Sequence, residues 1–356
     1  MSELKVNKVS PRTGTYVALN TVGMKNIIIN GDMSIAQRGT SDSSNTTGGY
    51  VTCDRWLADI DTQGTWTLSQ STEVPSGQGF SKSFKYDCTT ADASPAAGDK
   101  INLQQRLEGQ MLQYLKKGTS SAESTTLSFW VRSNKTGTYI CELQDVDNTR
   151  SISKSYTISA ADTWEKKTIT FAGDTSGALD NDNARSLDVI WYLGAGSNLT
   201  SGTLNTSWGS TVNANRAVGQ VNLADNTANE WYITGVQLEA GTTASDFEFL
   251  PNDINKNRCY RYFQKLSVVL MNFNTTGLLG FVFPVEMRAN PSVSREYSGT
   301  ANRMYNVGNA ATADVVSPIT IVSNKTIRYW YAFSPASWAT ATRSGWETEY
   351  TLDSEL

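Results

Sequence analysis

The side chains that could carry out chemistry are few and of a restricted kind. The 356-residue chain has no histidine, which removes the usual general base, the common Ser–His and Cys–His nucleophile pairs and the commonest metal ligand. Four aspartates close together in the sequence could still act as a carboxylate pair: Asp174, Asp180, Asp182 and Asp188. Asn181 and Gly177 among them indicate a solvated turn instead. We therefore expect a protein that is not an enzyme.

The cysteines and the charge balance narrow the classes of partner. The four cysteines are far apart and form no C-x-x-C pair, so we expect buried thiols and leave their disulfide state open: Cys53, Cys88, Cys141 and Cys259. The formal net charge of −4 offers no basic surface for nucleic acid. No apolar run approaches the length of a membrane span, and the charged opening residues predict synthesis in a cytoplasm without an export signal.

Aromatic residues are the remaining candidates for ligand contact. Ten tryptophans and fifteen tyrosines suit sugar stacking, because an aromatic face covers the apolar side of a pyranose ring. Most of these rings must belong to the core. Trp208 stands in a polar loop and Trp66 follows Gln63 and Gly64, so both are predicted to be exposed, and three tryptophans near the C-terminus are further candidates for glycan contact: Trp330, Trp338 and Trp346. Asp54 and Arg55 are interpreted as a buried ion pair closing one end of the fold, with a ligand pair as the alternative.

The elements that must position these residues are short strands. Residues 25–251 contain many short β-type runs separated by Gly, Asn, Asp and Ser, and runs such as LSFWVR at 127–132 alternate apolar and polar side chains. This pattern predicts an all-β fold, an antiparallel jelly-roll β-sandwich. One helix is expected over residues 110–117, which end in two lysines followed by Gly118.

Segments on either side of the sandwich complete the predicted organisation. Residues 1–24 alternate in polarity around a turn, and two strands without a core of their own must pack on something else, so they are predicted to serve attachment and oligomerisation. The apolar positions concerned are Leu4, Val6, Val9, Tyr16, Val17 and Leu19. Residues 252–257 follow a proline and are predicted to be a linker, and residues 258–356 a second, smaller β-sandwich domain.

Several phrases of the sequence resemble tail-fibre and related virion proteins of bacteriophages, particularly those of marine and cyanobacterial phages. LKVNKVSPRTG at 4–14 is similar to their N-terminal attachment stretch, and NIIINGDMSIAQRG at 26–39 with CDRW at 53–56 to the opening of their jelly-roll domain, which is itself like carbohydrate-binding modules. The pattern continues in order with QRLEG at 105–109, LSFWVR at 127–132, QLEAG at 237–241 and NRCYRYFQ at 257–264. These phrases span about the first three quarters of the chain.

The resemblance implies a homotrimeric fibre on the virion, attached to other phage proteins through its N-terminus, that contacts glycans of the host surface without inserting into the membrane. A capsid decoration or head-fibre protein and a polysaccharide depolymerase tailspike are the alternatives, and a carbohydrate-binding module of a cellular protein is a third class. Carbohydrate-binding jelly rolls often carry a structural calcium ion, for which Asp32 and Glu239 are weak candidates. No other cofactor is expected.

Overall fold

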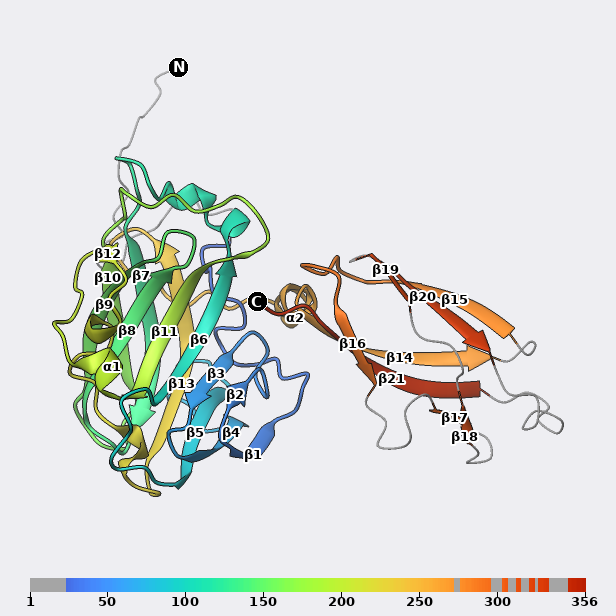
Figure 1. Ribbon diagram of the computed structural model, residues 1–356, viewed down its shortest axis with the longest axis horizontal. Coiled ribbons are helices and arrows are strands. Elements are labelled where there is room, and N and C mark those ends of the chain that lie inside the picture. Colours follow the sequence, from blue (N-terminus) through green and yellow to red (C-terminus); the bar gives the residue numbers. More distant parts are fainter. Residues whose placement is uncertain are drawn as a thin grey trace, which may run out of the picture.

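The computed structural model describes residues 24–271, 276–295, 303–306, 312–314, 320–323, 326–332 and 345–356. The six attachment residues predicted between Leu4 and Leu19 lie outside the described residues, as does Trp338. Figure 1 shows a β-sandwich followed by further strands and one longer helix. No helix in the described part of the chain is long and apolar enough to cross a membrane.

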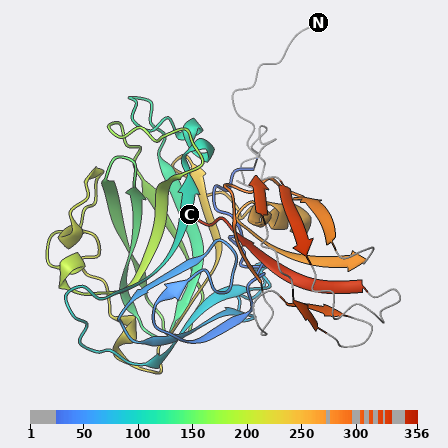
Figure 2. The same ribbon diagram turned by 45° about the vertical axis from the view of Figure 1, so that its right-hand side comes forward.

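Two antiparallel sheets form the sandwich, and the prediction of an all-β sandwich is confirmed. Sheet A contains, in spatial order, β1 (Ser41–Asn45), β4 (Thr65–Ser71), β5 (Ser83–Thr90), β13 (Glu230–Ala240), β7 (Thr125–Ser133) and β10 (Glu165–Phe171). Sheet B contains β12 (Gly209–Ser210), β9 (Arg150–Ile158), β8 (Gly137–Asp145), β11 (Arg185–Ala195), β6 (Lys100–Glu108), β3 (Leu57–Asp61) and β2 (Gly48–Gly49). The two sheets face one another in Figure 2.

The core between the sheets follows from the period-two alternation of the strands. Phe129 on β7 and Trp191 on β11 meet edge to face with ring centroids 5.8 Å apart, so the two sheets touch through aromatic rings. Trp56 packs on the same indole at 5.6 Å. Burying a side chain of this size stabilises the fold by about 1.5–3 kcal/mol, and the cluster is one continuous core drawn from both sheets.

The strands after the sandwich form two smaller antiparallel sheets. The first contains β14 (Phe263–Met271), β21 (Gly345–Asp353), β17 (Arg303–Asn306) and β18 (Thr312–Asp314), with β16 (Ser292–Arg295) also paired to β21. The second contains β15 (Thr276–Val282), β20 (Thr326–Ala332) and β19 (Thr320–Ser323). Both sheets lie to one side of the sandwich (Figure 1). The division of the chain into domains stays a prediction.

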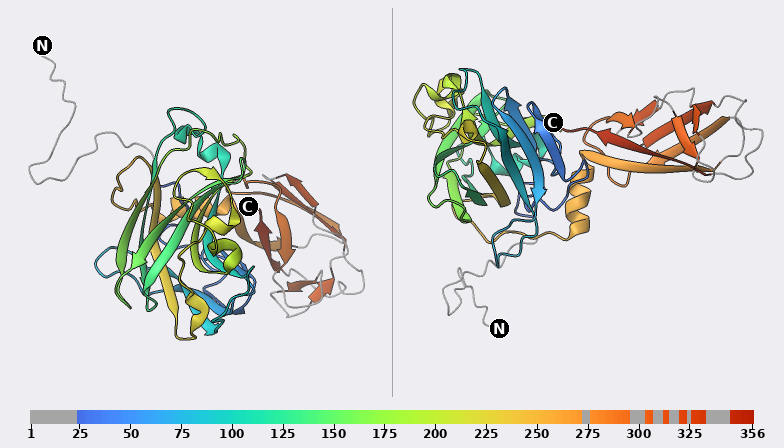
Figure 3. Two further views of the ribbon diagram at one scale, coloured as in Figure 1. Left: turned by 60° about the vertical axis from the view of Figure 1, so that its left-hand side comes forward. Right: turned by 90° about the horizontal axis from the view of Figure 1, so that it is seen from below.

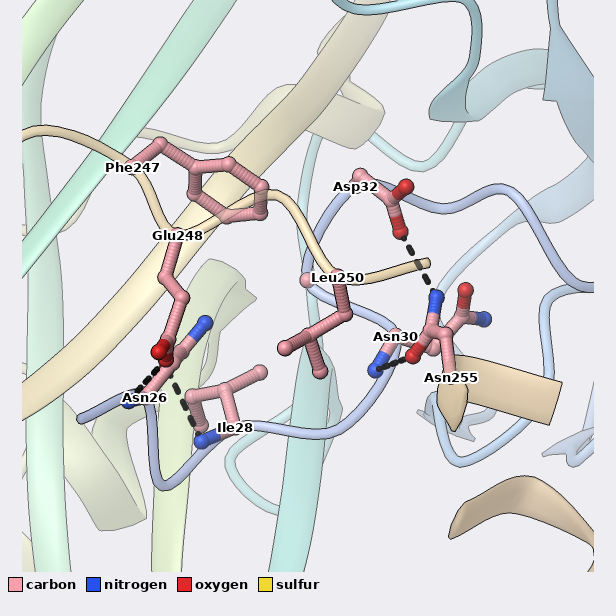
Figure 4. Close-up of a pocket in the computed structure, with 9 residues that line it drawn as sticks. Asn26, Ile28, Asn30, Asp32, Phe247, Glu248, Leu250 and Asn255 are labelled. Atoms are coloured by element: carbon pink, nitrogen blue, oxygen red, sulfur yellow. Dashed lines mark hydrogen bonds between the residues drawn. The ribbon is translucent and has the colours of Figure 1, made fainter. Parts of the chain in front are cut away.

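The predicted linker is in fact part of a helix. Residues 252–257 begin α2 (Asn252–Tyr260), which lies between the sandwich and the later strands (Figure 3). One of the polar side chains that suggested a linker, Asn255, is buried against the sandwich, whereas Asn252, Asp253 and Asn257 are exposed. Asn255 Oδ1 accepts a hydrogen bond from the backbone N–H of Asn30 at 3.2 Å, and its Nδ2 donates to Asp32 Oδ1 at 3.1 Å (Figure 4). Asn255 thus anchors the helix to the opening segment of the sandwich.

The helix expected over residues 110–117 is also corrected. The structure has two 3-10 helices there, η1 (Gly109–Met111) and η2 (Gln113–Leu115), and Lys116 adopts a left-handed conformation with φ of 52°. Leu112 and Leu115 are both buried and stand three residues apart. That spacing suits the three-residue turn of a 3-10 helix, where side chains i and i+3 lie directly above one another.

A buried ion pair joins the sandwich to the last residues of the chain. The Arg55 guanidinium is fully buried, forms an ion pair with Glu355 and stacks on the Tyr262 ring at 3.5 Å. Burial alone would lower the pKa of Arg55, but the Glu355 carboxylate more than offsets this, so the pKa is raised. Asp54 is buried too and instead accepts a hydrogen bond from the Gln37 amide at 2.8 Å. Both charges are buried as expected, yet they do not pair with each other.

Glu108 makes a second contact of this kind. Its carboxylate is buried at the end of β6 and accepts hydrogen bonds from Arg261 at 2.8 and 2.7 Å and from the Tyr262 hydroxyl. Burial alone would raise the pKa of Glu108, but the hydrogen bonds from Arg261 and Tyr262 bring it below its ordinary value.

The four cysteines are free thiols and all are buried.

The lowered pKa of Glu108 predicts how stability depends on pH. A carboxyl group whose pKa is lower in the folded state contributes stability above its unfolded pKa of about 4.3, and this contribution is lost as the pH falls through the folded value. We expect the melting temperature to drop below about pH 4.3, and the drop to be smaller in Glu108→Gln. Thermal melts from neutral to acid pH measure both. An equal drop in the two proteins would contradict the assignment.

Candidate functional site

A polar groove with a volume of about 480 Å³ crosses the outer face of sheet B. Its floor is made by outward-facing side chains of β3, β6, β8 and β11. One wall is the loop that carries α1 (Ser197–Thr200) and the 3-10 helix η3 (Asn213–Asn215). Leu199 and Ala217 fix this loop by packing on Ile140, Ile190 and Tyr192 of the sheet.

Strand register sets the order of the side chains on the groove floor. Asp59, Asn102 and Tyr192 stand opposite one another on β3, β6 and β11. Two residues further along, on the same face, Gln104 of β6 lies opposite Ile190 of β11. Because successive rows on one face are two residues apart, each row lies about 7 Å from the next.

The next row contains one arginine, and two further arginines reach it with their side chains. Arg106, Asp188 and Gln144 are directly opposite one another on β6, β11 and β8. The Asp188 carboxylate is fully buried and accepts from the Arg185 Nε at 2.8 Å. The Arg216 Nη2 reaches the row from the loop wall and donates to Gln144 Oε1 at 2.7 Å. Three guanidinium groups thus gather over adjacent strands.

Glu142 holds Arg216 in this position. Its carboxylate is completely buried and accepts from Arg216 Nε and Nη2 at 3.0 and 2.9 Å and from the Tyr192 hydroxyl at 2.8 Å. Burial alone would lower the pKa of Arg216, but Glu142, Tyr192 and Asp188 together outweigh burial, so the pKa is raised. The hydrogen bond that Arg185 donates to Asp188 is the main cause that raises the pKa of Arg185. Both arginines are therefore charged and fixed.

The opposite end of the groove is built from amides and a carboxylate. Asp59 Oδ2 accepts from Lys100 at 2.9 Å, from Asn102 at 3.2 Å and from Gln104 at 3.3 Å. Asn102 is only 3% exposed, and its Oδ1 is buried with no hydrogen-bond donor among the described residues. A buried acceptor without a donor is uncommon in folded proteins. Asn198 and Asn213 on the loop wall are exposed and face the groove.

Two predicted glycan contacts lie in the sandwich, and neither is in the groove. Trp66 was expected to be exposed but is 0% exposed and donates to the Gln63 carbonyl at 2.9 Å, so it is part of the core and is removed from the candidates. Its strand β4 turns it inward beside Tyr86, with ring centroids 5.7 Å apart. Trp208 is half-buried and its indole N–H donates to the Ala172 carbonyl at 2.7 Å. The Lys117 Nζ lies over the Trp208 ring, 4.4 Å from its centroid.

The other sequence-predicted residues are not brought together into one site. Trp330 lies on β20 and Trp346 on β21, in different sheets, and the structure does not describe their side chains. Asp32 binds Ser34 and Asn255, whereas Glu239 binds Gln237 and Ser245. Within the described ranges no cluster of three or more His, Cys, Asp or Glu residues could hold a metal ion. The two calcium candidates thus have separate protein partners.

Two of the four clustered aspartates are not in a solvated turn. Asp174 is buried and accepts from Lys117 Nζ and Arg150 Nε at 2.9 and 2.7 Å. Burial alone would raise the pKa of Asp174, but these hydrogen bonds bring it below its ordinary value. Asp188 lies within β11. Asp180 and Asp182 are exposed, as the turn residues around them predicted.

The groove is not predicted from the sequence, because only aromatic side chains are considered there as candidates for glycan contact. The signal was present in β6, where Lys100, Asn102, Gln104 and Arg106 occupy every second position and the positions between them are apolar except for Gln105. Such a strand predicts one wholly polar face. Arg185 and Arg216 could not have been assigned to the same face from the sequence, because their positions depend on contacts with Asp188 and Glu142.

Among known proteins, no family model matches the chain, and no curated protein matches it either. Its fold is similar to the enzymatically active domain of bacteriophage CBA120 tailspike protein 4, with 15% identity and a TM-score of 0.32 over 60% of this chain and 21% of that chain. The chain therefore spans about a fifth of the length of that tailspike.

Two further solved structures are similar to the sandwich. A putative sugar binding protein from Bacteroides thetaiotaomicron has 14% identity and a TM-score of 0.35 over 61% of this chain and 100% of that chain. The C-terminal family 22 carbohydrate-binding module of Clostridium thermocellum Xyn10B has 13% identity and a TM-score of 0.28 over 59% of this chain and 99% of that chain. Because the identities and TM-scores are low, the strand pairings, and not these similarities, establish the fold of the chain.

The ion pair under the groove predicts a stability effect. Arg216→Ala leaves the buried Glu142 carboxylate without a cation, and breaking a buried pair in this way costs about 3–5 kcal/mol. Chemical denaturation should show this loss in the free energy of unfolding. Arg132→Ala is the matched control, because its partner Asp162 is 60% exposed and an exposed pair contributes about 0–1 kcal/mol. Equal losses in the two variants would contradict a buried, structural Glu142.

Proposed function

We propose that the groove on sheet B binds a glycan, and that the chain is a homotrimeric subunit of a bacteriophage fibre that adsorbs to the host surface. The observation that carries glycan binding is the fixed set of polar groups on the groove floor. Asp59, Asn102, Gln104 and Arg216 are each held by hydrogen bonds to neighbours. A sugar presents many hydroxyl groups, and donors and acceptors that are already in place bind them with little loss of entropy.

The recognition in this groove differs from the aromatic stacking expected from the sequence. Tyr192 is the aromatic residue lining the groove, and it is 1% exposed with its hydroxyl bonded to Glu142. Its ring offers no open face on which a pyranose could lie. Hydrogen bonds and charge must therefore supply the affinity, which supports binding along the edges of the sugar rings, where the hydroxyl groups are.

The carboxylates of the groove support binding over hydrolysis. Two carboxylates line the groove: Asp59, which is paired with Lys100, and Asp61, which is exposed and has no ion-pair partner among the described residues. The other acids on this face are held in ion pairs, Asp188 with Arg185 and Glu142 with Arg216. Glycoside hydrolysis requires two carboxyl groups, one as general acid and the other as base or nucleophile. Asp61 has no second unpaired carboxylate beside it in the described lining, which is why we propose a binding subunit and not a depolymerase.

The fibre assignment rests on the ordered phrases that resemble phage virion proteins. Several of their residues hold the opening segment in place. Asn30 Nδ2 donates to the Ile35 and Asp54 carbonyls at 2.9 Å each, and Gln105 both donates to and accepts from the Ile29 backbone. A single sugar contact is weak, so three copies per fibre and several fibres per particle would raise the avidity for a host surface.

Groove binding predicts a loss of affinity when exposed lining residues are shortened. Asn198→Ala and Asn213→Ala each remove an exposed amide from the wall, and losing a hydrogen bond of about 0.5–1.5 kcal/mol should weaken binding to host polysaccharide about two- to tenfold. Isothermal titration measures this. Asn181→Ala, an exposed asparagine outside the groove lining, is the control. Unchanged affinity in both wall variants would place the glycan elsewhere.

The fibre assignment predicts trimerisation through residues 1–24. Val6→Asp combined with Val17→Asp places charges on apolar positions of the predicted strands, which disfavours their packing. We expect sedimentation to show a trimer for the natural chain and a smaller species for the double variant. Thermal unfolding of the sandwich serves as the control for folding. A natural chain that sediments as a monomer would contradict the fibre assignment.

A further inference from the structure

The arginine row gives the groove two chemically different ends. Arg106 and Asn102 are four residues apart on β6 and face the same side, so they lie about 13 Å apart. One end offers amides and the Asp59 carboxylate, which suit hydroxyl groups. The other end offers guanidinium groups. A ligand that spans both ends is longer than a single sugar ring.

The three arginines retain unused donors at the groove. Arg185 binds Asp188 through Nε and Nη2, and Arg216 binds Glu142 and Gln144 through the same two atoms, so Nη1 of each makes no hydrogen bond to the residues that the structure describes. Arg106 uses only Nη1, which donates to the Leu356 carbonyl at 2.6 Å. Its Nε is buried and has no acceptor among those residues.

The three arginines converge on one row of residues. Arg106 belongs to the row, Arg185 binds Asp188 of the row and Arg216 binds Gln144, and the backbones of these three adjacent strands together span about 10 Å. The buried Asp188 and Glu142 carboxylates lie beneath and are already paired, which leaves the free guanidinium nitrogens as the groups facing the groove. A planar guanidinium binds a carboxylate through two parallel hydrogen bonds, with higher specificity than an ammonium group.

From this geometry we infer that the glycan taken by the groove carries carboxylate groups, as a uronic-acid oligosaccharide does. The inference rests on the proposed glycan binding and specifies its ligand class. One carboxylate binds the arginine row, with Arg106 as the residue that determines specificity, while hydroxyl groups of a neighbouring ring bind Asn102 and Asp59. Arg106 is the informative position, because it pairs with no Asp or Glu side chain among the described residues, so its replacement leaves no buried side-chain acid unpaired.

The test compares three trisaccharides on the full chain by isothermal titration: trigalacturonate, its methyl ester and a sulfated neutral trisaccharide. Because a hydrogen bond to a charged group contributes about 1.5–3 kcal/mol, we expect trigalacturonate to bind at least about tenfold more tightly than the methyl ester. Raising the salt concentration should weaken trigalacturonate binding and leave the ester unaffected. Tighter binding of the sulfated sugar than of trigalacturonate would overturn the carboxylate assignment.

Variants identify the responsible side chain. Arg106→Gln should abolish the preference for trigalacturonate over its ester, and Arg106→Lys should restore only part of it because lysine lacks the planar pair of donors. Arg132→Gln on sheet A makes the same charge change away from the groove and should keep the full preference. Equal affinity for the acid and the ester in the natural chain overturns this inference and leaves glycan binding standing. Binding of none of the sugars overturns both.

Discussion

Carboxylates buried on sheet B have to be compensated by nearby cations, and this requirement explains where one loop and the end of α2 lie. An unpaired buried charge costs several kcal/mol, whereas a paired one is tolerated. Glu142 is compensated by Arg216, Asp188 by Arg185 and Glu108 by Arg261. Arg185 and Asp188 belong to the same strand, but the other two pairs join segments that are far apart in the sequence, so the loop of η3 and the end of α2 follow the positions of Glu142 and Glu108.

The same constraint produces both the groove and the junction. On the groove side, Arg216 must lie over β8 to meet Glu142, which brings the loop of α1 and η3 across the sheet as a wall. At the end of β6, next to Arg106, Glu108 binds Arg261 and Arg55 binds Glu355, and both contacts hold the residues that follow the sandwich against it. Replacing such pairs by apolar residues could stabilise the fold. Their retention fits a surface that needs fixed polar groups for recognition.

The architecture could be predicted from the sequence much better than the site could. Period-two runs such as those of β7 and β10 predicted the sandwich, because one face of each strand is apolar. Tertiary contacts overrode the local patterns elsewhere. Residues 252–257 are polar but helical, and Asn255 among them binds the backbone of the sandwich, while Trp66 is buried although its neighbours are polar. Arg216 depends on Glu142, 74 residues away in the sequence, which no local pattern reveals.

We propose that the polar groove on the outer face of sheet B binds a glycan, and a crystal structure of the full chain soaked with trigalacturonate is the decisive experiment. The sugar chain should lie along β6, with a carboxylate at Arg106, Arg185 and Arg216 and hydroxyl groups at Asn102 and Asp59. Sugar bound on the outer face of sheet A or on the C-terminal strands, with the groove filled only by water, would disprove binding in the groove.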